Sequence, residues 1–497
     1  MKRNSLDSLN PRRWWTLAVL CLSLLVIGLD NTILNVALPT LQRDLDATSS
    51  QLQWIVDVYM LVFAGVLLTA GSLGDRFGRK RALTLGLIVF GAGSLGSALA
   101  TSPDLLIVMR AIMGVGGAFI MPSTLSILVA TFPAHERAKA IGIWAGVSGL
   151  GIAIGPVAGG WLIERADWAW IFLVNVPIVL GALVAGRWLV PESRDESAPR
   201  LDLRGFTLSF AALTTLIWGL IEAPARGWTD GLVLGAFAVA LAVGAAFVAW
   251  ERRAPAPMLD VALFRNPRFT ASSAAISLAF FALFGMIFFL TQYMQLVKGY
   301  DALDAGIKTL PVAAGLVFAG PSSTKLAERI GLRAVVPLGL VFVAAGMFLI
   351  SLADASSSYG LIAAALVLLG YGIGTAMAPA TDAIMSVLPE AKMSVGSAIN
   401  DTTRVAGGSL GVAVLGSLLA SGYRGDMESA PEVARDSLAG ALATGNPQLI
   451  AAGQNAFMDA MQTATLVAVG VALAGALVAA VFLPRERRGR VGEVVPA

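Results

Sequence analysis

Residues 71–81, GSLGDRFGRKR, form a charged turn between two apolar segments, residues 52–71 and 82–103. The turn combines three glycines and one carboxylate with four cations. Each flanking segment has about the 20 mostly apolar residues that an α-helix needs to cross a bilayer. Because lysine and arginine gather in the cytoplasmic loops of membrane proteins, the turn is predicted to join two membrane-spanning helices on the cytoplasmic side.

The composition of the whole chain also indicates a membrane protein. Of its 497 residues 13% are charged, whereas a soluble globular protein has about 25%. The hydrophobic share is 57% and the mean hydropathy is +0.76, which excludes a soluble enzyme. A formal charge of +3 is too small to indicate nucleic-acid binding. One cysteine, Cys21, and one histidine, His135, exclude a disulfide scaffold and a Cys/His zinc site, so no bound metal is expected.

Apolar segments of membrane-spanning length follow one another along the chain, and we count fourteen of them. The predicted fold class is therefore all-α, a multi-pass membrane protein embedded in the lipid bilayer. The ten uncharged segments are residues 82–103, 111–134, 140–163, 168–186, 231–250, 269–297, 334–353, 355–381, 405–423 and 460–484. Four more contain or closely flank a charge: residues 14–36 around Asp30, 52–71 around Asp57, 205–221, and 303–322 around Lys308.

The distribution of cations predicts the orientation of the chain. An even number of spans places both termini on one side of the membrane, and most of the 35 lysines and arginines fall in the termini and the loops on that side. Both termini are therefore predicted to be cytoplasmic. The connections are short except for an external loop at about residues 422–458, which contains an Ala-rich stretch that is expected to be helical.

The charged turn has a counterpart in the second half of the chain. DRFG at residues 75–78 matches ERIG at residues 328–331, and at the same offset Gly86 matches Gly339 and Gly93 matches Gly346. The repeat predicts two six-helix bundles with two extra helices, residues 205–221 and 231–250, between them. Repeated halves are typical of transporters, whose substrate binds between the halves near the midplane. The predicted domains are residues 1–190, 191–268 and 269–497, with the extra helices packed at the periphery outside the transport path.

Charged residues inside the spans are costly and therefore indicate function. At a rise of about 1.5 Å per residue, Asp30, Asp57 and Arg110 lie at a similar depth, close to the external surface. We predict that these three side chains form one shared polar cluster. Asp401 and Arg404 are three residues apart on one span, and their spacing fits either mutual neutralisation or a role in transport.

Aromatic and polar side chains accompany these charges. Aromatic faces beside a desolvated carboxylate are what a lipophilic cation requires, although a lipid-facing stripe of phenylalanines would look the same. The candidates for substrate binding are Asp57, Trp54, Tyr59, Phe284, Phe288, Gln292, Tyr293 and Asn400.

Two glycine-rich motifs are predicted to control how the helices pack and move. In the turn at residues 71–81, glycines permit close approach, and the carboxylate can accept bonds at a helix N-terminus or from an arginine of the other half. The candidate residues of this conformational latch are Gly71, Asp75, Arg76, Gly78 and Arg79. Further along, Gly151, Gly155 and Gly159 repeat every four residues and form one flat helix face, while Pro156 permits bending.

These motifs together resemble those of the major facilitator superfamily, in particular its fourteen-span drug:proton antiporters. LDNTILNVALP at residues 29–39 resembles the first-helix signature of that branch, and residues 71–81 resemble the superfamily's loop motif. Arg110 with Gly114 resembles the fourth-helix motif, and GLGIAIGPVAGG at residues 149–160 resembles the fifth-helix antiporter motif.

Two further segments refine the resemblance. WIVDVY at residues 54–59 is most similar to members that export quaternary ammonium compounds and other cationic drugs. WAWIF at residues 168–172 departs from the usual pattern, because Ala169 stands where the family usually has arginine.

The resemblance implies a function as well as the major facilitator fold. It implies a multidrug exporter in the cytoplasmic (inner) membrane of a bacterium, which exchanges incoming protons for outgoing hydrophobic, mainly cationic compounds. The two bundles would alternate access without a cofactor, driven by the proton gradient, and we expect the monomer to be functional. Asp30 is assigned to proton coupling, Arg110 to tuning Asp30, Asp401 to a second proton or substrate site, and Asp57 to cation recognition.

Two other classes of protein remain open from the sequence. An exporter of a lipid or an endogenous metabolite would use the same fold, but would not need Asp57 beside Trp54. A membrane-embedded enzyme would need a nucleophile with a base, or a metal cluster, at midplane depth. Because His135 falls in a predicted cytoplasmic loop, no such arrangement is recognised, and the chain is not expected to be an enzyme.

Overall fold

The computed structural model describes residues 12–194, 201–255, 257–387 and 393–483. Within these ranges the chain is almost entirely helical, and fourteen helical segments are long and apolar enough to cross a membrane. The predicted number of spans is therefore confirmed. The spans are helical because backbone polar groups in a bilayer need hydrogen-bond partners within their own segment, and an α-helix provides them.

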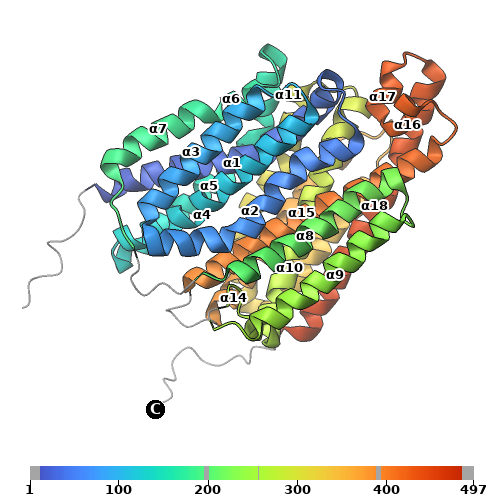
Figure 1. The fold of residues 1–497 in the computed structure, drawn as a ribbon. Coiled ribbons are helices and arrows are strands. Elements are labelled where there is room, and N and C mark those ends of the chain that lie inside the picture. Colours follow the sequence, from blue (N-terminus) through green and yellow to red (C-terminus); the bar gives the residue numbers. More distant parts are fainter. Residues whose placement is uncertain (1–11, 195–200, 256, 388–392, 484–497) are drawn as a thin grey trace, which may run out of the picture.

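Six spans of the first half pack together as one bundle (Figure 1). They are α1 (Arg13–Asp44), α2 (Ser49–Phe77), α3 (Arg79–Ala98), α4 (Pro103–Thr131), α5 (Ala134–Arg165), and the pair α6 (Trp170–Leu173) with α7 (Asn175–Leu189). Helix α1 packs along α5, and α4 packs against both α2 and α3. Small residues make these contacts close, since a side chain on Gly116 of α4 would run into the backbone of Phe90 in α3.

The second half also contains six spans. They are α10 (Pro267–Gln292) with the π-helical turn η2 (Tyr293–Val297), the pair α11 (Ala302–Thr309) and α12 (Pro311–Ile330), α13 (Leu332–Ser351), α14 (Tyr359–Ser386), α15 (Met393–Asp426) and α18 (Pro447–Phe482). Helices α13 and α12 pack on α14, and α10 packs on α15. The break between α11 and α12 falls at Pro311, which cannot continue the hydrogen bonding of the preceding helix.

The connection between α15 and α18 is shorter than the predicted loop at residues 422–458. Helix α15 extends to Asp426 and α18 begins at Pro447, where Asn446 caps it through its side chain. Two short helices, α16 (Glu432–Asp436) and α17 (Leu438–Ala443), lie between them. Both helices thus continue beyond the apolar segments at residues 405–423 and 460–484, because an apolar count does not detect helical residues outside an apolar segment.

The internal repeat is visible in the packing. A side chain on Gly86 of α3 would meet Gly116 and Phe119 of α4, and one on its counterpart Gly339 would meet Gly372 and Ala376 of α14. Gly93 and Gly346 likewise pack against α4 and α14, respectively. The matched glycines therefore make the same helix contact in each half.

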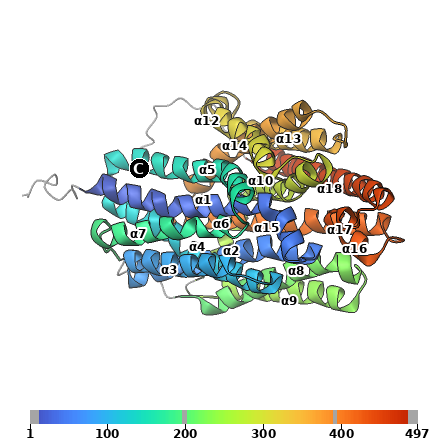
Figure 2. The same ribbon diagram turned by 90° about the horizontal axis from the view of Figure 1, so that it is seen from above.

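The two extra helices, α8 (Leu203–Arg226) and α9 (Gly231–Glu251), lie along one flank in both views (Figures 1 and 2). Helix α9 packs against α8, while α8 packs against α2 and α15. Ile221 and Leu220 of α8 accept hydrogen bonds from Ser50 and Ser417, respectively. The peripheral position was predicted, but α8 also bridges the two halves, so it is more than a tether.

The two ends of the bundle differ. The described chain begins at Arg12 and ends at Leu483 on one side, named the termini side, and α16 and α17 lie on the opposite side, named the loop side (Figures 1 and 2). The halves meet on the loop side, where α2 contacts α15 and α5 contacts α11. The termini-side part of α5 is open toward the rest of the described chain, in which a side chain on Gly142 or Gly146 would meet nothing within 4 Å. The molecule is thus closed between its halves on the loop side.

Candidate functional site

Asp30 and Arg110 form a buried ion pair within the first bundle. Arg110 of α4 donates from Nη1 to Oδ2 of Asp30 in α1 at 2.5 Å, and from Nε to the carbonyl of Ile55 in α2 at 3.1 Å. Its guanidinium lies 4.4 Å from the ring centroid of Tyr59. Exposure is 0% for Asp30 and 2% for Arg110. One arginine of α4 therefore joins α1 and α2 to its own helix. Its contact with Asp30 is the part of the predicted polar cluster that occurs.

Asp57 does not join this cluster, which corrects the prediction of three charges in one group. Its carboxylate is fully buried and accepts a hydrogen bond at 2.9 Å from Ser409 of α15, in the other half. Its second oxygen, Oδ2, has no hydrogen-bond partner among the described residues. The reason is helical geometry: Tyr59, two residues later, faces Arg110, and residues two apart point to opposite sides of a helix.

Three polar residues of α2 form a stripe that faces the second half. Ser49, Gln53 and Asp57 are four residues apart and therefore share one face of the helix. Ser417 of α15 donates to Gln53 at 3.4 Å, and the backbone N–H of Ser49 donates to Asp436 at 3.2 Å. This α2 stripe runs from the buried carboxylate to the loop-side surface, and each member bonds the opposite half.

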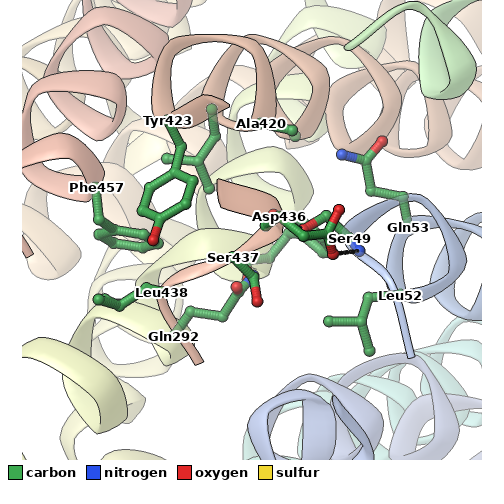
Figure 3. A pocket seen from close by; sticks show the side chains of 13 residues that line it. Ser49, Leu52, Gln53, Gln292, Ala420, Tyr423, Asp436, Ser437, Leu438 and Phe457 are labelled. Carbon is green, nitrogen blue, oxygen red and sulfur yellow. Dashed lines mark hydrogen bonds between the residues drawn. The ribbon is translucent and has the colours of Figure 1, made fainter. Parts of the chain in front are cut away.

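A pocket opens at the loop-side end of the α2 stripe (Figure 3). It combines aromatic, amide and carboxylate side chains from both halves, with Tyr423 and Phe457 on one side and Gln53 and Leu52 on the other. Its residues are Ser49, Leu52, Gln53, Phe288, Gln292, Gly416, Leu419, Ala420, Tyr423, Asp436, Ser437, Leu438 and Phe457.

The pocket contains two of the predicted substrate-binding residues, Phe288 and Gln292, and several that sequence reasoning missed. Gln53 was detectable, because it shares its helix face with Asp57 at a spacing of four. Tyr423 was also detectable, because it shares one face of α15 with Gly416 and Ala420. Asp436 was not, because it lies in a connection whose fold no periodic pattern determines.

Other predicted substrate-binding residues face elsewhere. Trp54 packs on an apolar cluster that includes Ile217 of α8, so it points toward the extra helices. Tyr59 is covered by Arg110, and Tyr293 donates through its hydroxyl to the carbonyl of Asp354 within the second bundle. Phe284 packs against Gly408 of α15. In this closed arrangement none of the four lines the pocket.

Asp401 and Arg404 pair with each other, at 2.9 Å, with side-chain exposures of 14% and 26%. The guanidinium of Arg404 also lies 5.4 Å from the ring centroid of Phe280. Neighbouring Asn400 is buried, and its Oδ1 has no partner in the described part of the chain. The charges of Asp401 and Arg404 thus neutralise each other. The amide oxygen of Asn400 beside them can accept a further hydrogen bond.

The turn at residues 71–81 makes its contacts within its own bundle. Asp75 pairs with Arg79 at 2.6 Å, and Glu192, which follows α7, accepts from the backbone N–H of Lys80. Gly78 adopts φ 121°, a region that favours glycine, with the Glu192 carboxylate close by. A bond from Asp75 to an arginine of the other half, one form of the predicted latch, does not occur among the described residues. Of the other latch candidates, Gly71 lies against Pro122 of α4, and Arg76 lies over the ring of Phe77.

The predicted flat face of α5 packs against α1. A side chain on Gly151 would meet Gly28, one on Gly155 would meet Thr32, and one on Gly159 would meet Ile33. The adjoining residue Pro156 contacts Gly306 of α11, so the same stretch also reaches the second half. The motif is thus a packing seam within the first bundle that also contributes to the contact between the halves.

Repeated bundles with buried charges at and near their junction define a membrane transporter. Residues 20–412 match the family described as Major Facilitator Superfamily. The chain belongs to this superfamily.

Named relatives place it among the drug-exporting members, as the resemblance predicted. The Multidrug efflux pump LfrA of Mycolicibacterium smegmatis is 38% identical over 489 residues, 95% of this chain and 97% of that protein. The Tetracenomycin C resistance and export protein of Streptomyces glaucescens is 37% identical, over 84% of this chain and 77% of that one. The Methyl viologen resistance protein SmvA of Salmonella typhimurium is 32% identical, over 94% of this chain and 95% of that protein.

A solved structure has the same fold. It is a bacterial homologue of the human lysosomal transporter Spinster, in an inward-facing and unoccupied conformation. The TM-score is 0.69, with 19% identity, covering 95% of this chain and 98% of that one. At this identity the likeness confirms the fold alone.

Proposed function

We propose that the protein is a proton-coupled multidrug exporter of lipophilic, mainly cationic compounds. The observation that carries the proposal is the presence of two fully buried carboxylates near the junction of the halves, Asp30 and Asp57, in a chain related to drug-export proteins. A buried carboxylate can exchange a proton or a cation as its surroundings open and close. The protein is on this view a transporter rather than an enzyme, functional as a monomer in a bacterial inner membrane.

The two carboxylates have different surroundings, which supports different roles. Asp30 already holds a cation, Arg110, within one bundle, so protonation of Asp30 would release Arg110 and loosen the contacts of α1, α2 and α4. Among the described residues Asp57 bonds only the uncharged Ser409, across the junction, so opening of the junction frees it for a cationic substrate. We assign Asp30 to proton coupling and Asp57 to cation recognition. Asp401, beside Arg404, is a second proton or substrate position.

The orientation follows from the charges. With most lysines and arginines on the termini side, that side is cytoplasmic. The closed loop side is then external, and the molecule is arranged to load from the cytoplasm. Outward release requires separation of α2 from α15 and of α5 from α11. It also requires separation of α1 from α10 and η2, because Thr291 and Gln295 donate hydrogen bonds to backbone carbonyls of α1.

Export of a lipid or an endogenous metabolite is the second candidate. It uses the same fold, and the apolar lining residues Leu52 and Leu438 would suit it. The carboxylate at position 57 is fully buried and its Oδ2 has no hydrogen-bond partner among the described residues, which favours a cation instead.

Transport by the purified protein in liposomes tests the proposal. An imposed proton gradient is expected to drive accumulation of tetraphenylphosphonium, and a protonophore to abolish it. Asp30→Asn removes the proposed coupling, whereas Asp382→Asn makes the same chemical change at an exposed position and serves as the control. Accumulation that persists with the protonophore, or in Asp30→Asn, would contradict proton coupling through Asp30.

A further inference from the structure

The loop-side pocket has the chemical composition of a cation site. Phe288, Tyr423 and Phe457 supply aromatic surface, and Gln53 and Gln292 supply amides. Asp436 supplies a carboxylate beside Ser49 (Figure 3). A mainly apolar wall with a few convergent polar groups is typical of small-molecule sites, and aromatic faces attract cations.

Asp436 holds the pocket closed through two sets of contacts. One carboxylate oxygen, Oδ1, pairs with Arg424 at the end of α15. The other, Oδ2, accepts the backbone N–H of Ser49 at the start of α2, and the hydroxyl of Ser49 donates to the backbone carbonyl of Asp436 at 2.7 Å. The Ser49 contacts cross between the halves, whereas the Arg424 contact lies within one half.

Separation of the halves on the loop side therefore changes the pocket in a defined way. The hairpin α16–α17 stays with the second half, because Tyr423 of α15 donates to the carbonyl of Ala434 at 2.8 Å. Ser49 moves away with α2. Oδ2 of Asp436 then loses its donor, and the enclosed part of the pocket, which has room for about one to two water molecules, widens.

The α2 stripe connects this pocket to Asp57. Gln53 lies one helical turn from Asp57 and itself lines the pocket. A compound released from Asp57 toward the loop side would meet these residues before reaching solvent.

We propose that the loop-side pocket is a second, weaker binding site for lipophilic monocations. In it Oδ2 of Asp436, whose Oδ1 stays paired with Arg424, contacts the cation, and Tyr423, Phe288 and Phe457 form aromatic walls. It forms as the halves separate and holds the compound on its way out. The inference rests on the proposed function for its direction of transport, but the site itself is a property of the pocket. Asp436 changes partner, from Ser49 in the closed arrangement to the cation in the open one.

Protection of introduced cysteines from labelling tests this site. In a Cys21→Ser background, which removes the native cysteine, Ala420→Cys and Ser437→Cys each place a thiol in the pocket. Val433→Cys, on a side chain that is 63% exposed outside the pocket, is the control. With tetraphenylphosphonium at about ten times its dissociation constant, labelling by a membrane-impermeant maleimide should slow about tenfold at the pocket positions and remain unchanged at position 433. Unchanged labelling at both pocket positions would overturn the proposal.

A second set of variants separates this site from Asp57. Asp436→Asn should raise the cation concentration needed for protection about tenfold, as expected for loss of one charge-assisted contact. Glu432→Gln, an exposed acid in the same hairpin, should leave it unchanged, and Asp57→Asn should leave pocket protection in place. Protection that is lost in Asp57→Asn but kept in Asp436→Asn would overturn the proposal. Failure of proton-driven transport with protection intact would instead overturn the proposed function alone.

Discussion

Arg110 of α4 links three helices of the first bundle. It is almost fully buried, and its guanidinium contacts a carboxylate on α1, a carbonyl of α2 and an aromatic ring of α2. Burial of both charges together is tolerable because each neutralises the other. Removal of one partner leaves an uncompensated buried charge, which costs about 3–5 kcal/mol.

The Asp30–Arg110 pair predicts the behaviour of a double-mutant cycle. Asp30→Asn should abolish proton-driven efflux and also lower the apparent melting temperature of the purified protein, because Arg110 loses its counter-charge. Adding Arg110→Met should recover much of the melting temperature without restoring efflux. Thermal unfolding and drug resistance of cells carrying each variant measure the two effects. Near-normal resistance in Asp30→Asn would refute the assignment.

Asp57 predicts selectivity rather than general loss of transport. Asp57→Asn removes a charge-assisted contact worth about 1–3 kcal/mol, so the affinity for monovalent cations should fall about 5- to 150-fold, with little change for neutral compounds. Ser409→Ala is the matched control, since it removes the only described hydrogen bond to Asp57 but keeps the charge. It should retain the preference for cations. Equal losses for cationic and neutral dyes in Asp57→Asn would contradict cation recognition by this residue.

At the scale of the helix, α5 divides into a packed part and an open part. Its loop-side glycines lie against α1 and α11, whereas Gly142 and Gly146 have free space around them. The same residue type thus serves two purposes in one helix. Close approach to α1 demands glycine on the loop side, while the termini-side glycines are free of neighbours in this closed arrangement.

This division predicts opposite effects of the same substitution. Gly155→Ala would place a methyl group against Thr32 and within 3.0 Å of the carbonyl of Leu29, and such overpacking costs about 1–3 kcal/mol. Gly146→Ala would meet nothing within 4 Å and should stabilise the helix by about 0.5–1 kcal/mol. The apparent melting temperature should fall for the first variant and rise for the second. A shift in the same direction for both would show that the seam with α1 does not limit stability.

At the scale of the whole molecule, the loop side holds the two bundles together. Helix α2 bonds α15 through the α2 stripe, and Glu164 of α5 accepts the backbone N–H of Leu303 in α11 at 2.8 Å. Helix α8 covers the α2–α15 junction from outside, and its carbonyls accept hydrogen bonds from both helices. Opening of the loop side must separate α2 from α15 while α8 keeps contact with at least one of them.

Cross-linking tests which contacts between the bundles must break during transport. In the Cys21→Ser background, a cross-link between Glu164→Cys and Leu303→Cys joins the bundles and should stop efflux, and reduction should restore it. Gln51 and Asp104, whose side chains bond at 2.9 Å on the loop side within the first bundle, provide the control pair. Their cross-link should leave efflux unchanged. Efflux that continues with α5 linked to α11 would mean that this junction stays closed during transport.

The sequence by itself determined the number of spans, the repeat and the flat face of α5. These features depend on local rules, namely the apolar length needed to cross a bilayer and the periodicity of one helix. The pairing of Asp30 with Arg110 also followed from depth, because two opposite charges at one level in apolar surroundings gain most by meeting. Matched glycines such as Gly86 and Gly339 were recognisable because each half repeats the same close helix contact.

Only the tertiary structure decided which neighbour each helix face meets. Depth predicted one level for Asp57 and Arg110, but the rotation of α2 directs Asp57 to Ser409 and Tyr59 to Arg110. That rotation is set by packing against α4, α8 and α15 together, which no single helix pattern contains. The same holds for Asp436, whose loop has no periodicity and whose partner Ser49 lies 387 residues away in the sequence. Long-range contacts of this kind depend on how the surfaces of several helices fit together. The pattern of any one helix therefore cannot predict them.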